Sequence, residues 1–326
     1  MITLPSGRRV RLGGFRRPPA QGPHFRLKNY LLSALPDEPP SIDYTIGSSV
    51  SAALADVEGN DALGDCVIAW LVHQEALWTG NATGTAWHAT LAQVTDLYSK
   101  IAGYVPGNPA TDVGTDPAAA CNWIVANGFP NGNRPLGWVR VEGSNTKLLR
   151  QALWLFEGCG FGIGLPQAYV DAMGSMKSGF TWGAAGPAIA GNGHMFLGAG
   201  YNTTGVTIDT WGMLGTFTYE AIAQYAVASN GGEIDILLSA DMIASAAQKA
   251  PSGFDWRSLV SDFDELGGSV AVPPAPPPPV PVGPPTLSLA QQWAAAGIQS
   301  APAALFDAQQ AIAAANAGLA KYWPAS

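Results

Sequence analysis

Apolar residues recur at helical spacing in the first half of the chain and at strand-like spacing in the second half. After Cys66, apolar side chains follow one another at intervals of three and four residues, which predicts a helix that begins at this cysteine. The same reasoning predicts further helices over 90–102, 117–127, 145–156, 219–227 and 241–249. Strands are predicted over 136–141, 159–165, 195–201, 206–211 and 233–238, and residues 166–192 are read as irregular.

This order of elements indicates an α+β fold, in which helices are segregated from an antiparallel sheet. Asn202, Thr203, Thr204 and Gly205 form a turn-like run between two strand patterns, so residues 195–211 are expected to form a hairpin. Asp116 followed by Pro117 is typical of a helix start, and Gly128 of a helix end.

Both ends of the chain differ in composition from the middle. Residues 1–40 contain proline pairs and are expected to form an extended basic arm, and residues 41–250 are expected to form the folded body. Nine of the fifteen residues in 271–285 are proline, which predicts a stiff spacer within a linker over 251–285. Residues 286–326 are rich in alanine and are expected to form a helical hairpin that docks on a partner or on the body.

Charge and cysteine content narrow the classes of protein that fit. Residues 1–28 carry seven basic residues and no acid, whereas the whole chain of 326 residues has a net charge of −8. The arm is therefore expected to be a solvated tail or to bind an acidic partner or nucleic acid. Three cysteines argue against a disulfide framework, and neither a signal peptide nor a membrane span is recognised, so a cytoplasmic location is expected.

Cys66 is the candidate nucleophile, because the polar turn Gly59–Asp65 brings it to the start of a helix. Unpaired backbone N–H groups and the helix dipole at such a position favour a thiolate, so its pKa is expected to fall. Asp65 is placed to cap the helix. Cys121 and Cys159 are expected to be core thiols.

A cysteine nucleophile needs a base, and His194 is the candidate because it opens a predicted strand. His73 lies two helical turns after Cys66, about 10 Å along the axis, which is too far for contact with the thiol. Across the predicted hairpin, Asp209 is expected to lie opposite residues 194–196 and to orient the imidazole. Trp211 is expected to shield that bond from water. Neither a metal cluster nor a cofactor-binding motif is recognised in the sequence.

These three segments, in this order, resemble the papain-like cysteine peptidases. The run from Gly64 through Cys66 to Trp70 is similar to the family's nucleophile segment, the run 194–201 to its histidine strand, and Asp209-Thr210-Trp211-Gly212 to its Asn-Ser-Trp-Gly. The resemblance spans about residues 40–245. It implies a papain-like fold without a cofactor, a Cys66–His194–Asp209 triad, and an oxyanion donor at Asn60. Gly64, Asp65 and Trp211 would then form the wall of the site.

Three functions follow as alternatives. The first is a peptidase that hydrolyses peptide or protein substrates. The second is an inactive papain-like module used in assembly, since the arm, the spacer and the terminal helices resemble attachment segments of bacteriophage or prophage proteins, which would place the chain in a virion. The third is a cell-wall amidase or endopeptidase, which also uses cysteine and histidine. No membrane partner is expected.

Overall fold

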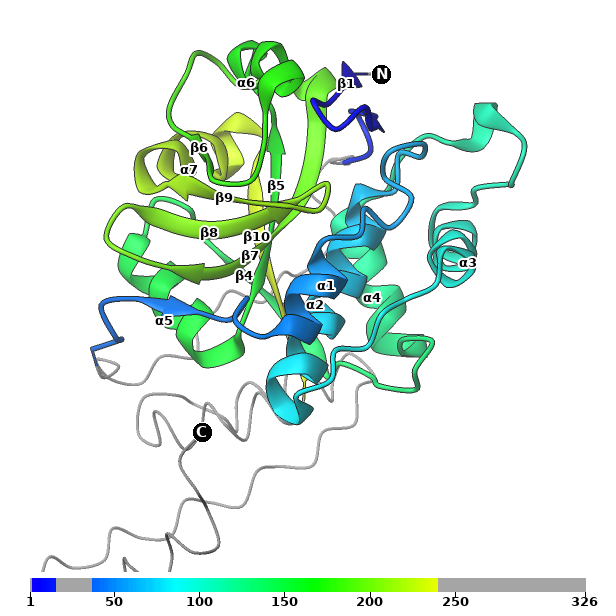
Figure 1. Ribbon diagram of the computed structural model, residues 1–326, viewed down its shortest axis with the longest axis horizontal. Helices are drawn as coiled ribbons and strands as arrows, with labels where there is room; N and C mark the ends of the chain where they lie inside the picture. Colours follow the sequence, from blue (N-terminus) through cyan, green and yellow to red (C-terminus); the bar gives the residue numbers. More distant parts are fainter. Residues whose placement is uncertain (1, 16–36, 240–326) are drawn as a thin grey trace, which may run out of the picture. The chain divides into compact units, whose positions relative to one another are not determined.

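The computed structural model describes residues 2–15 and 37–239, which form seven α-helices and ten strands within these ranges (Figure 1). The α-helices are α1 Ser48–Leu54, α2 Cys66–Thr83, α3 Leu91–Ala102, α4 Pro117–Asn127, α5 Thr146–Phe156, α6 Gln167–Ala172 and α7 Tyr219–Tyr225. Short 3-10 helices are η2 Pro109–Thr111, η3 Met173–Ser175, η4 Ala190–Asn192 and η5 Ala228–Asn230.

Eight strands form one sheet in the order β4-β10-β5-β7-β8-β9-β6, and β3 pairs with β7 beside this path. They are β3 Ile42–Asp43, β4 Gly137–Val141, β5 Cys159–Gly164, β6 Phe180–Trp182, β7 Gly193–Tyr201, β8 Gly205–Thr210, β9 Met213–Thr218 and β10 Glu233–Leu238. All of these pairs are antiparallel except β6 with β9. The α+β class expected from the sequence is therefore confirmed.

The predicted helix starts have clear local causes. The Asp116 side chain accepts a hydrogen bond from the Ala118 N–H at the start of α4, and the Asn145 side chain accepts one from the Leu148 N–H in α5. Thr90 and Gln93 form a reciprocal capping box at the start of α3. These polar side chains satisfy backbone donors that have no partner within the helix, and so they fix where each helix begins.

Helix α2 connects the two halves of the fold, and Figure 1 shows it between the sheet and α3. It packs on α1, α3 and α4 and on the strands β5 and β7. Trp70 of α2 lies so close to Gly160 of β5 that a Cβ at this glycine would overlap the indole ring. This close approach fixes the position of Cys66 relative to the sheet. Among the described helices, none has the length and apolar character needed to cross a membrane.

Three features of the chain depart from the sequence-based expectations. Residues 48–54 form a helix that was not predicted, and residues 166–192 contain α6, η3, β6 and η4. Residues 2–15 are not a free arm: β1 Ile2–Thr3 pairs with β2 Arg9–Val10, and Leu4, Val10 and Phe15 are buried. The helix over 241–249, the linker over 251–285 and the helical segment over 286–326 lie outside the described residues.

Candidate active site

Cys66 is the first residue of α2, as the sequence predicts, but its thiol is fully covered. The Met195 N–H donates a hydrogen bond to Sγ at 3.4 Å. Burial raises the pKa of Cys66 to about 12, against the opposing effect of this hydrogen bond. The lowered pKa expected from the helix start is therefore wrong for this state, because the loss of solvent outweighs the helix dipole.

Asn60 and Asp65 interact with each other beside Cys66. Asn60 Nδ2 donates to Asp65 Oδ1 and to the Leu63 carbonyl, at 3.1 Å each, so the amide expected to bind an oxyanion fixes its own loop. Asp65 occupies the N-cap position, but its side chain caps no backbone N–H. Burial raises the pKa of Asp65 to about 8, which keeps this group largely protonated at neutral pH and removes a negative charge from beside the thiol.

His194 lies at the start of β7 and is also buried. Its Nε2 lies 2.7 Å from Thr210 Oγ1, and its ring stacks on the Trp211 indole at a centroid distance of 4.1 Å and an angle of 14°. Trp211 thus covers the imidazole itself, whereas it was expected to shield a bond between His194 and Asp209. Burial lowers the pKa of His194 to about 3, so the imidazole is neutral at pH 7.

Asp209 does not orient His194, which corrects the expected triad. Its Oδ2 lies 2.9 Å from His73 Nδ1, in an ion pair buried between β8 and α2. Asp209 lies opposite Leu197 in the β7–β8 ladder, so both side chains project to one face of the sheet and His194 to the other. The β-bulge between Gly198 and Tyr201 shifts the register, and a one-residue shift reverses the face on which Asp209 lies.

Thr210 takes the position next to the imidazole that was expected of Asp209. Its hydroxyl is a neutral partner that fixes the ring without charging it. The sequence places Thr210 near the site, because it directly precedes Trp211. The residue pattern does not show the register shift at the bulge, and so it could not predict that Thr210 replaces Asp209 beside the imidazole.

Cys66 thus contacts β7 at the residue next to His194, and the two side chains bond to different partners. No hydrogen bond joins their side chains in the part of the chain that the structure describes, since Cys66 Sγ is bonded by the Met195 N–H and His194 Nε2 by Thr210. With the pKa of Cys66 raised and that of His194 lowered, the described state holds a neutral thiol and a neutral imidazole. It is not a thiolate–imidazolium pair.

Glu58 joins the site to a second group of charges. Its carboxylate is 3% exposed, and its Oε1 lies 3.7 Å from His73 Nε2 and 3.6 Å from His88 Nε2. His88 Nε2 also lies 3.0 Å from Asp56 Oδ2. Asp56, Glu58 and His88 offer ligand atoms within 4.8 Å of one another, a spacing that suits a metal ion, and the ion pairs among them account for this grouping.

We expect Glu58 to make the protein less stable as the pH rises. Burial raises its pKa to about 7 from an ordinary value of 4.5, with opposing effects from the nearby histidines. The folded state then binds a proton that the unfolded state has lost, and this stabilisation disappears as the pH rises through 7. At about 1.4 kcal/mol per pKa unit, the free energy of unfolding should fall by up to about 3 kcal/mol.

Denaturant unfolding between pH 5 and pH 8 measures this change. In Glu58→Gln the part of the fall that comes from Glu58 should be absent, while the part that comes from Asp65, whose pKa is raised to about 8, remains. The exposed Asp96→Asn serves as the control that retains both parts. Equal pH profiles for the wild type and Glu58→Gln would contradict the assignment.

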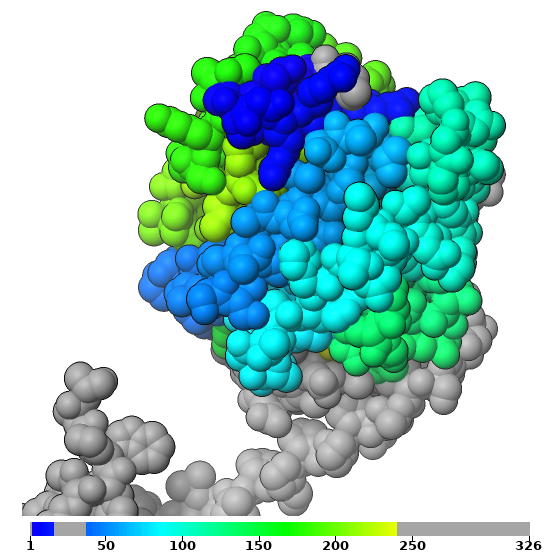
Figure 2. Space-filling model, turned by 45° about the vertical axis from the view of Figure 1, so that its right-hand side comes forward, coloured from blue at the N-terminus to red at the C-terminus, as the bar shows by residue number. Residues whose placement is uncertain are grey.

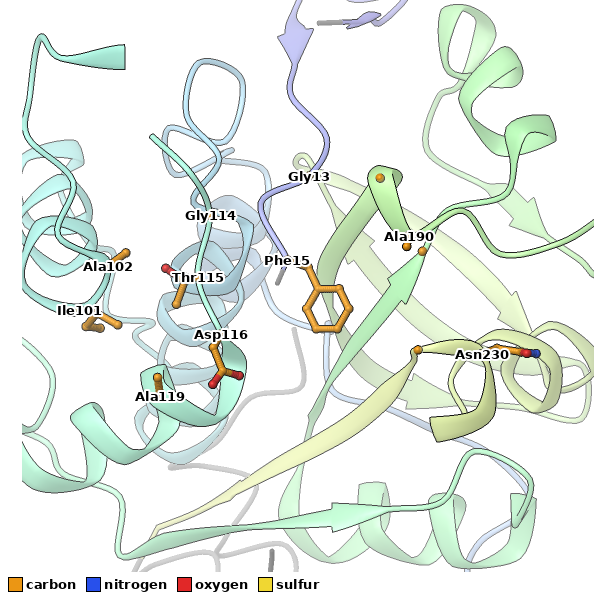
Figure 3. A pocket seen from close by; sticks show the side chains of 13 residues that line it. Gly13, Phe15, Ile101, Ala102, Gly114, Thr115, Asp116, Ala119, Ala190 and Asn230 are labelled. Atoms are coloured by element: carbon orange, nitrogen blue, oxygen red, sulfur yellow. The ribbon is translucent and has the colours of Figure 1, made fainter. Parts of the chain in front are cut away.

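The N-terminal segment lies in the cleft above Cys66. Gly13 N–H donates to the Gly193 carbonyl at 2.8 Å on the sheet side, and Thr115 N–H donates to the Gly14 carbonyl at 2.8 Å on the helical side. Figure 3 shows the segment running between these two walls, with the Phe15 ring turned toward the sheet. A cavity of about 860 Å³ continues beside it. The cleft thus already holds a peptide segment, which the chain itself supplies.

Comparisons with known proteins found resemblance in structure only. No family model matches the sequence, and no curated protein matches it. Procathepsin L2 from the Tenebrio molitor larval midgut is 14% identical, with 70% of this chain and 78% of that one covered at a TM-score of 0.48. Xylellain, a cysteine protease from Xylella fastidiosa, is 15% identical, with 71% and 98% covered at a TM-score of 0.43. The Carica candamarcensis cysteine protease CMS1MS2, in complex with E-64, is 16% identical, with 62% and 99% covered at a TM-score of 0.44.

Proposed function

We propose that this protein is a cysteine peptidase in which Cys66 attacks the carbonyl of an extended peptide and His194 transfers the proton. The observation that carries the proposal is the peptide already present: residues 13–15 cross the cleft, hydrogen-bonded to both walls, with Gly14 directly over Cys66 Sγ. A cleft that holds a peptide backbone beside a thiol at a helix start brings a candidate substrate to a candidate nucleophile.

In this proposal the described state is a resting state, in which residues 13–15 cover Cys66. Cys66 and His194 are both neutral because both are buried, and the segment over the thiol is part of what buries it. Displacing this segment brings water to Cys66, which lowers the cost of forming a thiolate. The helix-start N–H groups and the Met195 N–H are then available to stabilise the thiolate and the oxyanion.

A second candidate is an inactive papain-like module that serves in assembly. It is favoured by the absence of a hydrogen bond between Cys66 and His194 in the described residues, and by the use of Asp209 in the pair with His73. In this reading the cleft is a docking site for a peptide, and the cysteine is an ordinary core thiol.

Hydrolysis of a quenched fluorescent peptide library by the full-length protein separates the two candidates. In Cys66→Ala we expect activity to fall by at least about a thousandfold, as for loss of other catalytic nucleophiles. Cys121→Ala is the matched control, because Cys121 is a second buried thiol that does not line the cavity beside residues 13–15, and this variant should keep its activity. Hydrolysis retained in Cys66→Ala overturns the proposal, as does an inactive wild type whose Cys66 reacts no faster than free cysteine.

A further inference from the structure

Residues 11–15, which cross the cleft, are bound there through three successive sets of contacts. Arg11 forms an ion pair with Asp112 and also donates to the Asp112 carbonyl at 2.8 Å. Gly13 and Gly14 make the backbone hydrogen bonds to Gly193 and Thr115. Beyond them, Phe15 forms a parallel bridge with Thr115 and is 7% exposed. The cleft therefore contacts a basic side chain, two peptide units and an aromatic ring in turn.

The position over the thiol has no room for a side chain. A Cβ at Gly14 would lie 2.5 Å from the Gly64 carbonyl oxygen and 2.9 Å from Cys66 Sγ. The obstacle is largely backbone, which cannot turn aside as the end of a flexible side chain can. Gly13 has φ +84°, a conformation that residues with side chains rarely adopt. The cleft thus selects two consecutive glycines for steric and conformational reasons.

The walls of the cleft are shaped for the same backbone. A Cβ at Gly114 would overlap the Gly14 carbonyl, and a Cβ at Gly193 would overlap the Phe15 carbonyl. A Cβ at Gly162 would lie 2.7 Å from the Phe15 ring. Glycines in the walls therefore leave space for a closely approaching peptide and for one flat aromatic side chain.

Hydrogen bonds fix the Asp112 carboxylate in a position to bind a cationic side chain. Its Oδ1 accepts hydrogen bonds from Tyr98 Oη and from the Gly64 N–H, at 2.9 Å each, and its side chain is buried. This arrangement leaves the other carboxylate oxygen, Oδ2, for Arg11. Arginine presents a fork of N–H donors that matches such a carboxylate better than a point charge does.

We infer that the cleft is a recognition site for peptides of the form Arg-X-Gly-Gly-aromatic, and that residues 11–15 occupy it as an internal copy of that ligand. That such peptides are substrates rests on the proposed peptidase function. That the cleft binds them does not depend on this function. The ligand is a peptide segment of another protein, and it exchanges with residues 11–15.

Alkylation of Cys66 by iodoacetamide, followed by peptide mass spectrometry on the full-length protein, reports whether the cleft is filled. Gly14→Leu cannot occupy the position over the thiol, so Cys66 should react at least about tenfold faster than in the wild type. Gly191→Ala is the matched control, because this glycine lines the same cavity and has open space for a Cβ. Arg11→Asp, which repels Asp112 without altering the core, is a second way to release the segment if Gly14→Leu fails to fold.

Adding the peptide Arg-Leu-Gly-Gly-Phe-Arg to the released variant tests the recognition itself. It should protect Cys66 from alkylation, and peptides with alanine in place of the second glycine or of the first arginine should need at least about tenfold higher concentration. Equal protection by the three peptides, or no protection, overturns the inference even if other peptides are hydrolysed. Protection without hydrolysis of any peptide supports the inference and counts against the proposed peptidase.

Discussion

Asp209→Ala is expected to lower the free energy of unfolding by about 3–5 kcal/mol, the usual cost of removing one partner from a buried ion pair. The variant leaves His73 buried without its nearest carboxylate, 2.9 Å away in the wild type. Burial alone would lower the pKa of His73, but Asp209 and then Glu58 raise it. Without Asp209 the imidazole loses its main reason to be protonated. Urea unfolding at pH 6 measures the loss.

The double variant His73→Leu/Asp209→Leu tests whether the pair is the cause. Replacing both partners with apolar groups removes the buried imidazole that Asp209→Ala leaves without its carboxylate, so it should recover a large part of the stability lost in Asp209→Ala. Thr210→Val is the control from the same strand, and it should affect the His194 environment far more than stability. If Asp209→Ala is as stable as the wild type but inactive, Asp209 acts on His194 and the pairing described above is wrong.

Arg140→Ala is expected to be comparably destabilising, by about 3–5 kcal/mol. Arg140 lies opposite Asp235 in the β4–β10 ladder and donates to it from Nε at 2.7 Å and from Nη2 at 3.1 Å, and Nη2 also lies 2.9 Å from Glu233 Oε2. Both acids are buried. Removing the guanidinium leaves two carboxylates close together in a sheet with no solvent to screen them.

Lys100→Ala provides the matched control for Arg140→Ala. Lys100 also pairs with an acid, Asp96 at 2.6 Å, but both side chains are 55% exposed. An exposed pair of this kind contributes at most about 0.5 kcal/mol. Thermal and urea unfolding of the two variants should therefore differ clearly, and a small effect of Arg140→Ala would show that the sheet relaxes around the two acids.

The order of the elements could be predicted from the sequence because it depends on local chemistry. The start of α2 at Cys66, the cap of α4 at Asp116 and the strand β10 over 233–238 all appear where the residue pattern places them. Each depends on side chains within a few residues of one another. That Trp211 lies near His194 also follows from the hairpin, although the His194–Asp209 bond that Trp211 was expected to shield is replaced by the pair of Asp209 with His73.

The partners within the site depend on contacts that no local pattern records. A bulge between Gly198 and Tyr201 decides that Asp209 faces α2, and only packing of α2 on β7 brings His73 to it. The basic N-terminal residues suggested a solvated tail or an arm that binds an acidic partner or nucleic acid. In the structure Arg11 is instead held by Asp112, which is 101 positions away in sequence.

The N-terminal hairpin also reaches the histidine side of the site. Arg8 Nη1 donates to the carbonyl of Trp211 at 2.9 Å, and Trp211 adopts a left-handed conformation with φ 51° that is costly for a residue with a large side chain. Figure 2 shows the dark-blue N-terminal residues lying on the surface beside both the green and the light-blue parts of the chain. Residues 8–15 thus cover the Cys66 thiol and also bind the turn at Trp211, whose indole stacks on the His194 imidazole. When this segment leaves the cleft, its contacts with Cys66 and with Trp211 are lost in one step. The reactivity of Cys66 and the mobility of the Trp211 turn should therefore rise in parallel.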